Sequence, residues 1–223
     1  MAVHELLPAL VNRYLAAQLA GDRRVALRII LDEALAAGVS VPDLYLHILQ
    51  PAQHQIGRLW EENRIGVAEE HLATAISQLV LAHLYPFLPR APDNGQRVLI
   101  ACVAGELHDM GARITADFFE MAGFGVRLLG ADVPTESLVA MTREAPPDLL
   151  VLSTTMTFNV PALRDAALRT REAVGDRLRL GAGGHALTWA PGLGKQLDAE
   201  ISEDDVVAMV AAARRVLLGV GPP

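Results

Sequence analysis

The chain has 223 residues, 52% of them hydrophobic and 20% charged, which supplies enough apolar material for one or two packed domains and excludes a disordered chain. Its formal net charge of −7, with scattered Lys and Arg, excludes a basic nucleic-acid-binding face, and its single cysteine, Cys102, excludes a disulfide scaffold. No apolar stretch reaches the roughly 20 residues of a membrane span and no basic signal-peptide start is present, so we expect a cytoplasmic protein.

Residues 1–89 show helical periodicity throughout and predict a four-helix bundle. The first helix ends at Gly21, and Asp22 begins the second, which closes at Gly38. Ser40 is a candidate N-cap for a third helix that runs to Trp60, and Pro51 is expected to bend it. The fourth helix is predicted over 67–84.

Residues 90–96 are polar turn formers and are expected to form a linker. Beyond them, residues 97–223 alternate short apolar strands with amphipathic helices, which predicts a doubly wound parallel sheet, a Rossmann-like fold. We expect strands at 98–103, 125–129, 148–152 and from 178, and helices at 110–121, 135–144, 160–174 and 204–217. Ligands of such sheets bind at the carboxyl ends of the strands, where the strand order reverses.

The loops after three of these strands contain polar and small residues suited to ligand binding. They are Gly105-Glu106-Leu107-His108-Asp109-Met110-Gly111, Ser153-Thr154-Thr155 and Gly181-Ala182-Gly183-Gly184. His108 is a candidate metal ligand because a carboxylate, preferably that of Glu106, can hold its second ring nitrogen. Taken singly, each feature also fits a solvated histidine, a helix cap or a common turn. Their shared position on one rim of the sheet favours a site.

These residues resemble the cobalamin-binding domain of methionine synthase, corrinoid methyl-transfer proteins and cobalamin photoreceptors. The resemblance covers about residues 95–218 and rests on Glu106-x-His108-x-x-Gly111, Ser153-x-Thr155 and Gly183-Gly184. It implies that His108 replaces the cofactor's own base on the lower face of cobalt. It further implies that the displaced base lies in a channel lined by Ser153, Thr155, Gly183 and Gly184. Many members have Asp at the position of Glu106. A Glu at this position resembles the photoreceptor branch.

A second resemblance lies in the helical region. Trp60, nine intervening residues, then Glu70-His71 is similar to the Trp-x9-Glu-His signature of cobalamin-dependent photoreceptor regulators. The resemblance implies that Trp60 covers the adenosyl group on the upper face of cobalt, and that Glu70 and His71 contact that group. The alternative is that Trp60 is a core residue and Glu70 a favourable charge near a helix N-terminus.

Two departures from the photoreceptor regulators affect the expected function. The helix-turn-helix domain that precedes their bundle has no counterpart in this sequence, so direct DNA binding is not expected. Well-known members have a histidine directly after the Trp, which binds cobalt after illumination, and here that residue is Glu61. His54 and His71 are possible substitutes.

The leading interpretation is a signalling protein, not an enzyme. Adenosylcobalamin, bound between the bundle and the α/β domain, would sense light and signal through a homo-oligomer or an unknown protein partner. Photocobilins resemble this layout, so biliverdin is a candidate second chromophore. One alternative is a corrinoid methyl carrier for a methyltransferase system, against which Trp60 argues. The other is an α/β domain without a corrinoid, against which His108 argues.

Overall fold

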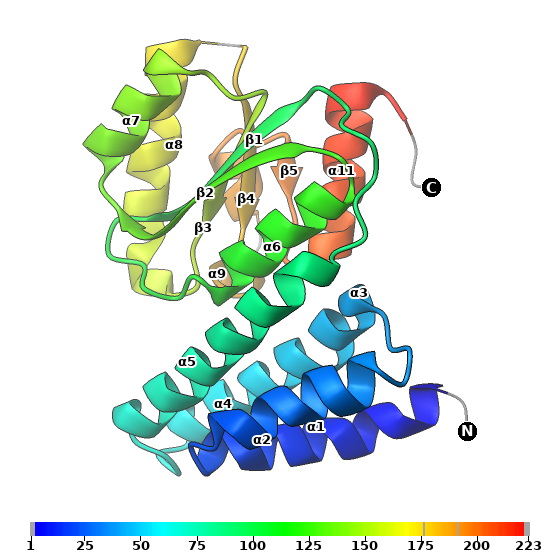
Figure 1. Ribbon diagram of the computed structural model, residues 1–223. Coiled ribbons are helices and arrows are strands. Elements are labelled where there is room, and N and C mark those ends of the chain that lie inside the picture. Colours follow the sequence, from blue (N-terminus) through cyan, green and yellow to red (C-terminus); the bar gives the residue numbers. More distant parts are fainter. Residues whose placement is uncertain (1–2, 176, 191, 221–223) are drawn as a thin grey trace. The chain divides into compact units, whose positions relative to one another are not determined.

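The computed structural model describes residues 3–175, 177–190 and 192–220. It separates into two compact units, a helical unit, Met1–Pro89, and an α/β unit, Arg90–Pro223. Figure 1 shows the helices of the first unit and the sheet with its covering helices in the second. Within the described residues, no helix combines the length and apolarity needed to cross a bilayer.

The helical unit, as far as it is described, contains the four expected helical segments. The second and third combine α-helical and π-helical turns. The segments are α1 (Val3–Leu19); α2 (Arg23–Leu27) with η1 (Arg28–Leu35); α3 (Val41–Leu44), η2 (Tyr45–Leu49) and α4 (Gln50–Glu61); and α5 (Val67–Leu84), followed by the 3-10 turn η3 (Tyr85–Phe87).

The helix starts in this unit follow the expected capping chemistry. Asp22 accepts hydrogen bonds from the backbone N–H groups of Arg24 and Val25, and Ser40 accepts one from Asp43. Pro51 does not break the third segment. The irregular hydrogen bonding lies just before it, in the π-helical residues Tyr45–Leu49, where a wider turn accommodates the missing proline donor.

The α/β unit has a five-stranded parallel sheet in the order β2-β1-β3-β4-β5, which confirms the predicted fold class. The chain moves to one side of β1 to form β2 and to the other side to form β3. The reversal of strand order therefore lies between β1 and β3, where ligands of such sheets bind. The strands are β1 (Arg97–Val103), β2 (Gly125–Val133), β3 (Leu149–Ser153), β4 (Arg179–Gly183) and β5 (Ile201–Ser202).

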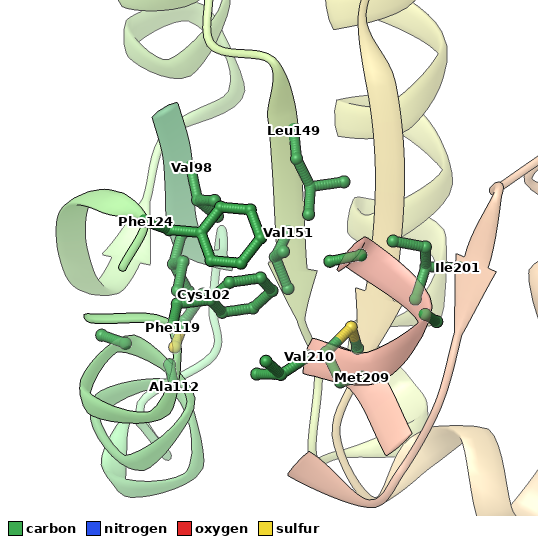
Figure 2. Close-up of a cluster of buried hydrophobic side chains, with 14 residues drawn as sticks. Val98, Cys102, Ala112, Phe119, Phe124, Leu149, Val151, Ile201, Met209 and Val210 are labelled. Atoms are coloured by element: carbon green, nitrogen blue, oxygen red, sulfur yellow. The ribbon is translucent and has the colours of Figure 1, made fainter. Parts of the chain in front are cut away.

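Helices cover both faces of this sheet (Figure 1). Alternate side chains of β1 enter two separate cores. Val98, Ile100 and Cys102 pack with α6 and α11, whereas Leu99, Ala101 and Val103 pack with α7 and α8. Figure 2 shows the first core, in which Phe119 and Phe124 form an edge-to-face pair. The helices are α6 (Met110–Met121), α7 (Thr135–Glu144), η4 (Thr157–Asn159), α8 (Val160–Val174), α9 (Ala186–Trp189), α10 (Leu193–Gln196) and α11 (Val206–Leu218).

Three details differ from the sequence-based expectations. The segment 90–96, expected as a linker, is bonded to the end of α6, because Ala91 N–H donates to Met121 O and Asn94 N–H to Gly123 O. The fourth strand extends through Gly183, so Gly181–Gly183 lie in β4 and not in the following loop. The short elements α9, α10 and β5 were not predicted, because two to four residues carry no periodic signal.

Candidate functional site

The loop between β1 and α6 contains a buried carboxylate bonded to a partly exposed imidazole. Glu106 is fully buried, while the side chain of His108 is 48% exposed. Glu106 Oε1 lies 2.5 Å from His108 Nδ1 and also accepts the backbone N–H of His108 at 3.0 Å. The predicted Glu106–His108 pair is therefore present in this unit.

The second oxygen of Glu106 is held by the loop after β3. Oε2 accepts the backbone N–H groups of Thr155 and Met156, both at 2.9 Å, and the side-chain amide of Asn159 at 3.0 Å. Five donor contacts thus surround one carboxylate. The structure brings Thr155 to Glu106 as a backbone donor, a role that its side-chain chemistry did not indicate.

These donors keep Glu106 ionised. Burial raises the pKa of Glu106, but hydrogen bonds from His108, Met156 and Asn159 outweigh it and lower the pKa from 4.5 to about 2. An ionised carboxylate only accepts hydrogen bonds, so the Nδ1 atom of His108 must carry the proton. In the neutral form of this ring the lone pair is on Nε2, the atom that would bind a metal.

Asp132, at the end of β2, positions the same loop from the other side. Its Oδ1 accepts the N–H of Gly105 at 2.7 Å, and its own N–H donates to Glu106 O at 2.9 Å. Gly105 has a φ of +81°, a conformation that favours glycine. Sequence reasoning missed Asp132 and Asn159, because it considered only the residues directly following three of the strands.

Contacts within the α/β unit itself explain the other predicted loop residues without a ligand. Ser153 ends β3, and a Cβ on Gly183 would lie 3.2 Å from Met209 Cε. Gly184 has a φ of +98°, and a Cβ there would lie 2.4 Å from Thr154 O. The added atoms would meet protein, so these glycines give no evidence of the predicted channel. The channel itself stays a prediction.

Two features near His108 have no such internal explanation. A Cβ on Gly111, in the first turn of α6, would meet no atom within 4 Å. Thr154 Oγ1 is buried and makes no hydrogen bond within the described part of the chain. Both are compatible with a ligand that approaches this edge of the sheet.

The remaining residues of the β1–α6 loop differ in exposure, since some face solvent and others are packed inside the unit. Leu107 is 69% exposed, whereas Met110 is buried and Asp109 accepts from Arg113 Nε at 2.9 Å. Phe158 and Trp189, in the segments after β3 and β4, are also 69% exposed. The carboxyl edge of the sheet therefore presents three large apolar side chains, of which sequence reasoning identified only Leu107.

In the helical unit, Trp60 and the Glu70-His71 pair lie on either side of the turn between α4 and α5. Trp60 is 37% exposed, which argues against a purely core role. Glu70 Oε2 lies 2.6 Å from His71 Nδ1, and Glu70 Oε1 accepts the hydroxyl of Thr74 at 2.7 Å. The side chain of His71 is 72% exposed.

Partly buried polar side chains continue the hydrogen-bonded chain that begins at Glu70. Gln53 donates to Thr74 Oγ1 at 2.6 Å and accepts from Ser77 at 3.2 Å, and Ser77 lies 3.1 Å from the hydroxyl of Tyr14. Burial raises the pKa of Tyr14, and the contact with Ser77 opposes it only in part. Tyr14 is therefore a neutral hydroxyl anchor for this chain at physiological pH.

Known protein families match both units. The family model described as B12 binding domain matches residues 96–218, and a second model of the same description matches residues 10–85. The HTH-type transcriptional repressor CarH of Myxococcus xanthus is 35% identical over 160 residues, which are 70% of this chain and 52% of CarH. The chain thus spans about half the length of CarH.

Corrinoid proteins of methanogens are also similar. Dimethylamine corrinoid protein 2 of Methanosarcina acetivorans is 27% identical over 195 residues, covering 85% of this chain and 82% of the relative. The solved structure of the Methanosarcina barkeri monomethylamine corrinoid protein superposes with a TM-score of 0.83 at 22% identity, covering 97% of this chain and all of that one, a likeness of fold. Since a family model matches more than half of its length, the chain belongs to the B12 binding domain family and is a cobalamin-binding protein.

Proposed function

We propose that this protein is a light sensor that holds adenosylcobalamin, with His108 as the lower ligand of cobalt. The observation that supports the proposal best is the pair of Glu106 and His108. A buried, ionised carboxylate lies 2.5 Å from Nδ1 of a partly exposed imidazole, the arrangement by which second-shell carboxylates orient metal-binding histidines.

The residues around His108 fit a bulky corrinoid. Gly111 leaves open space one turn from the imidazole, and the buried Thr154 hydroxyl makes no hydrogen bond within the residues that the structure describes. Leu107 and Phe158 add exposed apolar surface at the same edge of the sheet, suited to the hydrophobic periphery of a macrocycle. The cofactor supplies a cobalt–carbon bond that light can break.

The helical unit supports sensing over methyl transfer. Trp60 is a large, partly exposed side chain of α4, His71 of α5 is exposed and bonded to Glu70, and we propose that these three residues accommodate the upper ligand of cobalt. An indole over the upper ligand would obstruct the access that a methyl carrier must give to its partners. The 35% identity to CarH, a transcriptional repressor, is consistent with a regulatory role.

Signalling would pass through the protein's own assembly state or a protein partner. Release of the upper ligand would remove the group that Trp60 and His71 contact and so change the surface of the helical unit. A homo-oligomer that changes its state, or a partner that binds one state, would transmit the signal. The scattered Lys and Arg and the net charge of −7 do not favour direct DNA contact.

The test is the absorbance spectrum of protein reconstituted with adenosylcobalamin, before and after green light, followed by size-exclusion chromatography. We expect a light-dependent spectral change together with a change in elution volume. His108→Ala should alter the dark spectrum or weaken binding. A reconstituted protein with the same assembly state in dark and light would exclude a sensor that acts through oligomerisation. An unchanged spectrum would exclude light sensing by the cobalt–carbon bond.

The second candidate is a corrinoid methyl carrier, favoured by the similarity to dimethylamine corrinoid protein 2 over 85% of this chain. The alkyl group on the cobalamin that co-purifies with the protein distinguishes the two functions. Adenosylcobalamin supports the sensor, and methylcobalamin with transfer to a thiol acceptor supports the carrier.

A bilin is proposed as an additional chromophore, because Glu61 occupies the place of the histidine that binds cobalt in well-known photoreceptors. Incubation with biliverdin should then produce a red absorbance band that remains bound through gel filtration. Complete loss of the bilin on the column would remove biliverdin from the proposal and leave the cobalamin site unaffected.

A further inference from the structure

We infer that a hydrogen-bonded chain in the helical unit makes the packing of α1 depend on the charged carboxylate of Glu70. The chain runs from Glu70 through Thr74, Gln53 and Ser77 to Tyr14, and so joins α5, α4 and α1. All five residues lie within one compact unit. The chain itself needs no cofactor, and its use in signalling rests on the proposed function, in which Glu70 contacts the upper ligand.

The charge of Glu70 sets the direction of every hydrogen bond in this chain. A carboxylate anion can only accept, so Thr74 donates its one hydroxyl hydrogen to Glu70 Oε1 at 2.7 Å. Thr74 must then accept from the amide of Gln53, at 2.6 Å, and the amide oxygen of Gln53 accepts from Ser77, at 3.2 Å. Since Ser77 has no second hydrogen, the hydroxyl of Tyr14 must donate to it, at 3.1 Å. All the donors therefore point toward Glu70.

The hydroxyl of Ser77 also holds a second residue of α1. Gln18 Nε2 donates to Ser77 Oγ at 2.9 Å and to Ala73 O at 3.1 Å. Tyr14 and Gln18 lie one turn apart on α1, and both are fully buried. Ser77 Oγ thus makes one donor and two acceptor contacts, the full capacity of a hydroxyl, and two of these contacts join it to α1.

One buried atom at the α1 end of the chain lacks a partner. Gln18 Oε1 accepts no hydrogen bond from any residue that the structure describes, although Gln18 is fully buried. A buried carbonyl without a donor costs free energy, which a small shift of α1 or the entry of water would recover. The contacts to Ser77 oppose such a shift, so a weaker chain would release α1 from this position.

Glu70 lies where an event at the surface of the unit can reach the chain. Its Oε1 accepts from Thr74, and its Oε2 lies 2.6 Å from Nδ1 of His71, whose side chain is 72% exposed. A ligand that binds this carboxylate, or leaves it, changes the acceptor strength that Thr74 meets. Because hydrogen bonds in a chain polarise one another, the change reaches Ser77 and the two residues of α1. The helical unit would thus convert an event at Glu70 into a change in the packing of α1.

The test uses the ¹³Cζ resonances of the three tyrosines in the full chain, because the shift of this atom reports how the hydroxyl is hydrogen-bonded. Tyr45 of η2 and Tyr85 of η3 serve as internal references. Glu70→Gln keeps the size but lets either end of an amide face Thr74, so the direction of the chain is no longer fixed. The variant should shift the Tyr14 resonance and leave the other two in place. It should also speed amide exchange in α1 by roughly 3- to 10-fold, at the lower end of the coupling between members of one network.

Variants of Thr74 show whether the effect travels through the chain. Thr74→Val interrupts it, and in that background Glu70→Gln should no longer move the Tyr14 resonance. Thr74→Ser keeps the hydroxyl and should behave as the wild type. If Thr74→Val does not fold, Gln53→Met interrupts the chain one bond further along. The same shift of Tyr14 with the chain intact and interrupted would overturn the inference.

The matched control is Glu33→Gln, which removes an exposed carboxylate 2.6 Å from Arg13, the neighbour of Tyr14 on α1. It should leave the Tyr14 resonance unchanged, and a shift as large as that of Glu70→Gln would show that any charge near α1 acts alike and would refute the chain. The link to the proposed function is tested by adding adenosylcobalamin in the dark. A Tyr14 resonance that responds to Glu70→Gln but not to the cofactor supports the chain and removes Glu70 from the upper ligand.

Discussion

Replacing the buried carboxylate by its amide, Glu106→Gln, removes the charge that organises the loop between β1 and α6. The amide nitrogen of a glutamine has no lone pair for the N–H groups that now reach both oxygens of Glu106. The variant should therefore be less stable than the wild type at neutral pH, and the difference should depend on pH.

The pKa of Glu106 gives the size and direction of this effect. Its value is about 2 in the folded protein, against an ordinary value of 4.5 in the unfolded chain, a difference worth about 3 kcal/mol at neutral pH. Because the folded value is depressed, the stabilisation is complete above about pH 5 and is lost as the pH falls toward 2. At pH 3, about 2 kcal/mol of this stabilisation should already be lost.

The measurement is urea unfolding at several pH values between 7 and 3, followed by the deuterium uptake of peptides that cover β1 and β3. These strands lie in the α/β unit, so their exchange reports that unit and not the helical one. The control is Glu136→Gln, which removes an exposed carboxylate bonded to Arg169 and should change stability little, because solvent screens such surface pairs.

We expect the free energies of unfolding of wild type and Glu106→Gln to converge as the pH falls. Parallel pH profiles for the two proteins would refute the assignment of a strongly depressed pKa to Glu106. Convergence of the Glu136→Gln profile instead would show that surface charge, and not the buried pair, governs acid stability.

Three further outcomes are expected. His108→Ala should bind cobalamin more weakly or with another lower ligand, and a wild-type visible spectrum would exclude His108 as the ligand. Gly184→Ala should destabilise the apo protein by several kcal/mol, because its Cβ meets Thr154 O. Gly111→Ala should leave the thermal midpoint unchanged but weaken cobalamin binding, because its Cβ meets no protein atom. Equal thermal midpoints for the two variants would contradict this expectation. In titrations, Trp60→Ala should weaken adenosylcobalamin binding more than methylcobalamin binding. The loss in binding free energy should be less than the roughly 3–5 kcal/mol of a fully packed site, because the side chain is 37% exposed. Equal losses for the two cobalamins would refute the role of Trp60 at the upper ligand.

Much of the fold follows from periodicity in the sequence. The helices at 110–121, 135–144 and 160–174 begin and end as predicted, because each is amphipathic and bounded by turn residues. The ends of strands are harder to predict from sequence, because contacts with ligands or with neighbouring elements determine their last residues. Gly181–Gly183 look like a turn in sequence, but in β4 a Cβ on Gly181 would lie 3.3 Å from Val151 Cγ2, and the small residues fit that close packing.

The sequence predicts the Glu106–His108 pair of the candidate site. It does not predict the residues that hydrogen-bond to this loop and hold it in place. His108 and Glu106 are two residues apart, and the sequence alone indicates that they can meet. Asn159 is 53 positions from Glu106 and Asp132 is 27 from Gly105, so only the sheet topology brings them to this loop. An asparagine or aspartate in a loop has no distinguishing sequence signal, because both residues are common in turns.

The pairs Glu106–His108 and Glu70–His71 differ in how strongly the surrounding residues hold them. In both, a glutamate oxygen lies within 2.6 Å of the Nδ1 atom of the imidazole. Glu106 is fully buried and accepts five donor contacts, whereas the side chain of Glu70 is 17% exposed and that of His71 is 72% exposed. Solvent can compete for the second pair and cannot reach the first carboxylate. This difference is consistent with the proposed roles, in which His108 is a lasting ligand of cobalt and His71 makes a contact that changes with the upper ligand.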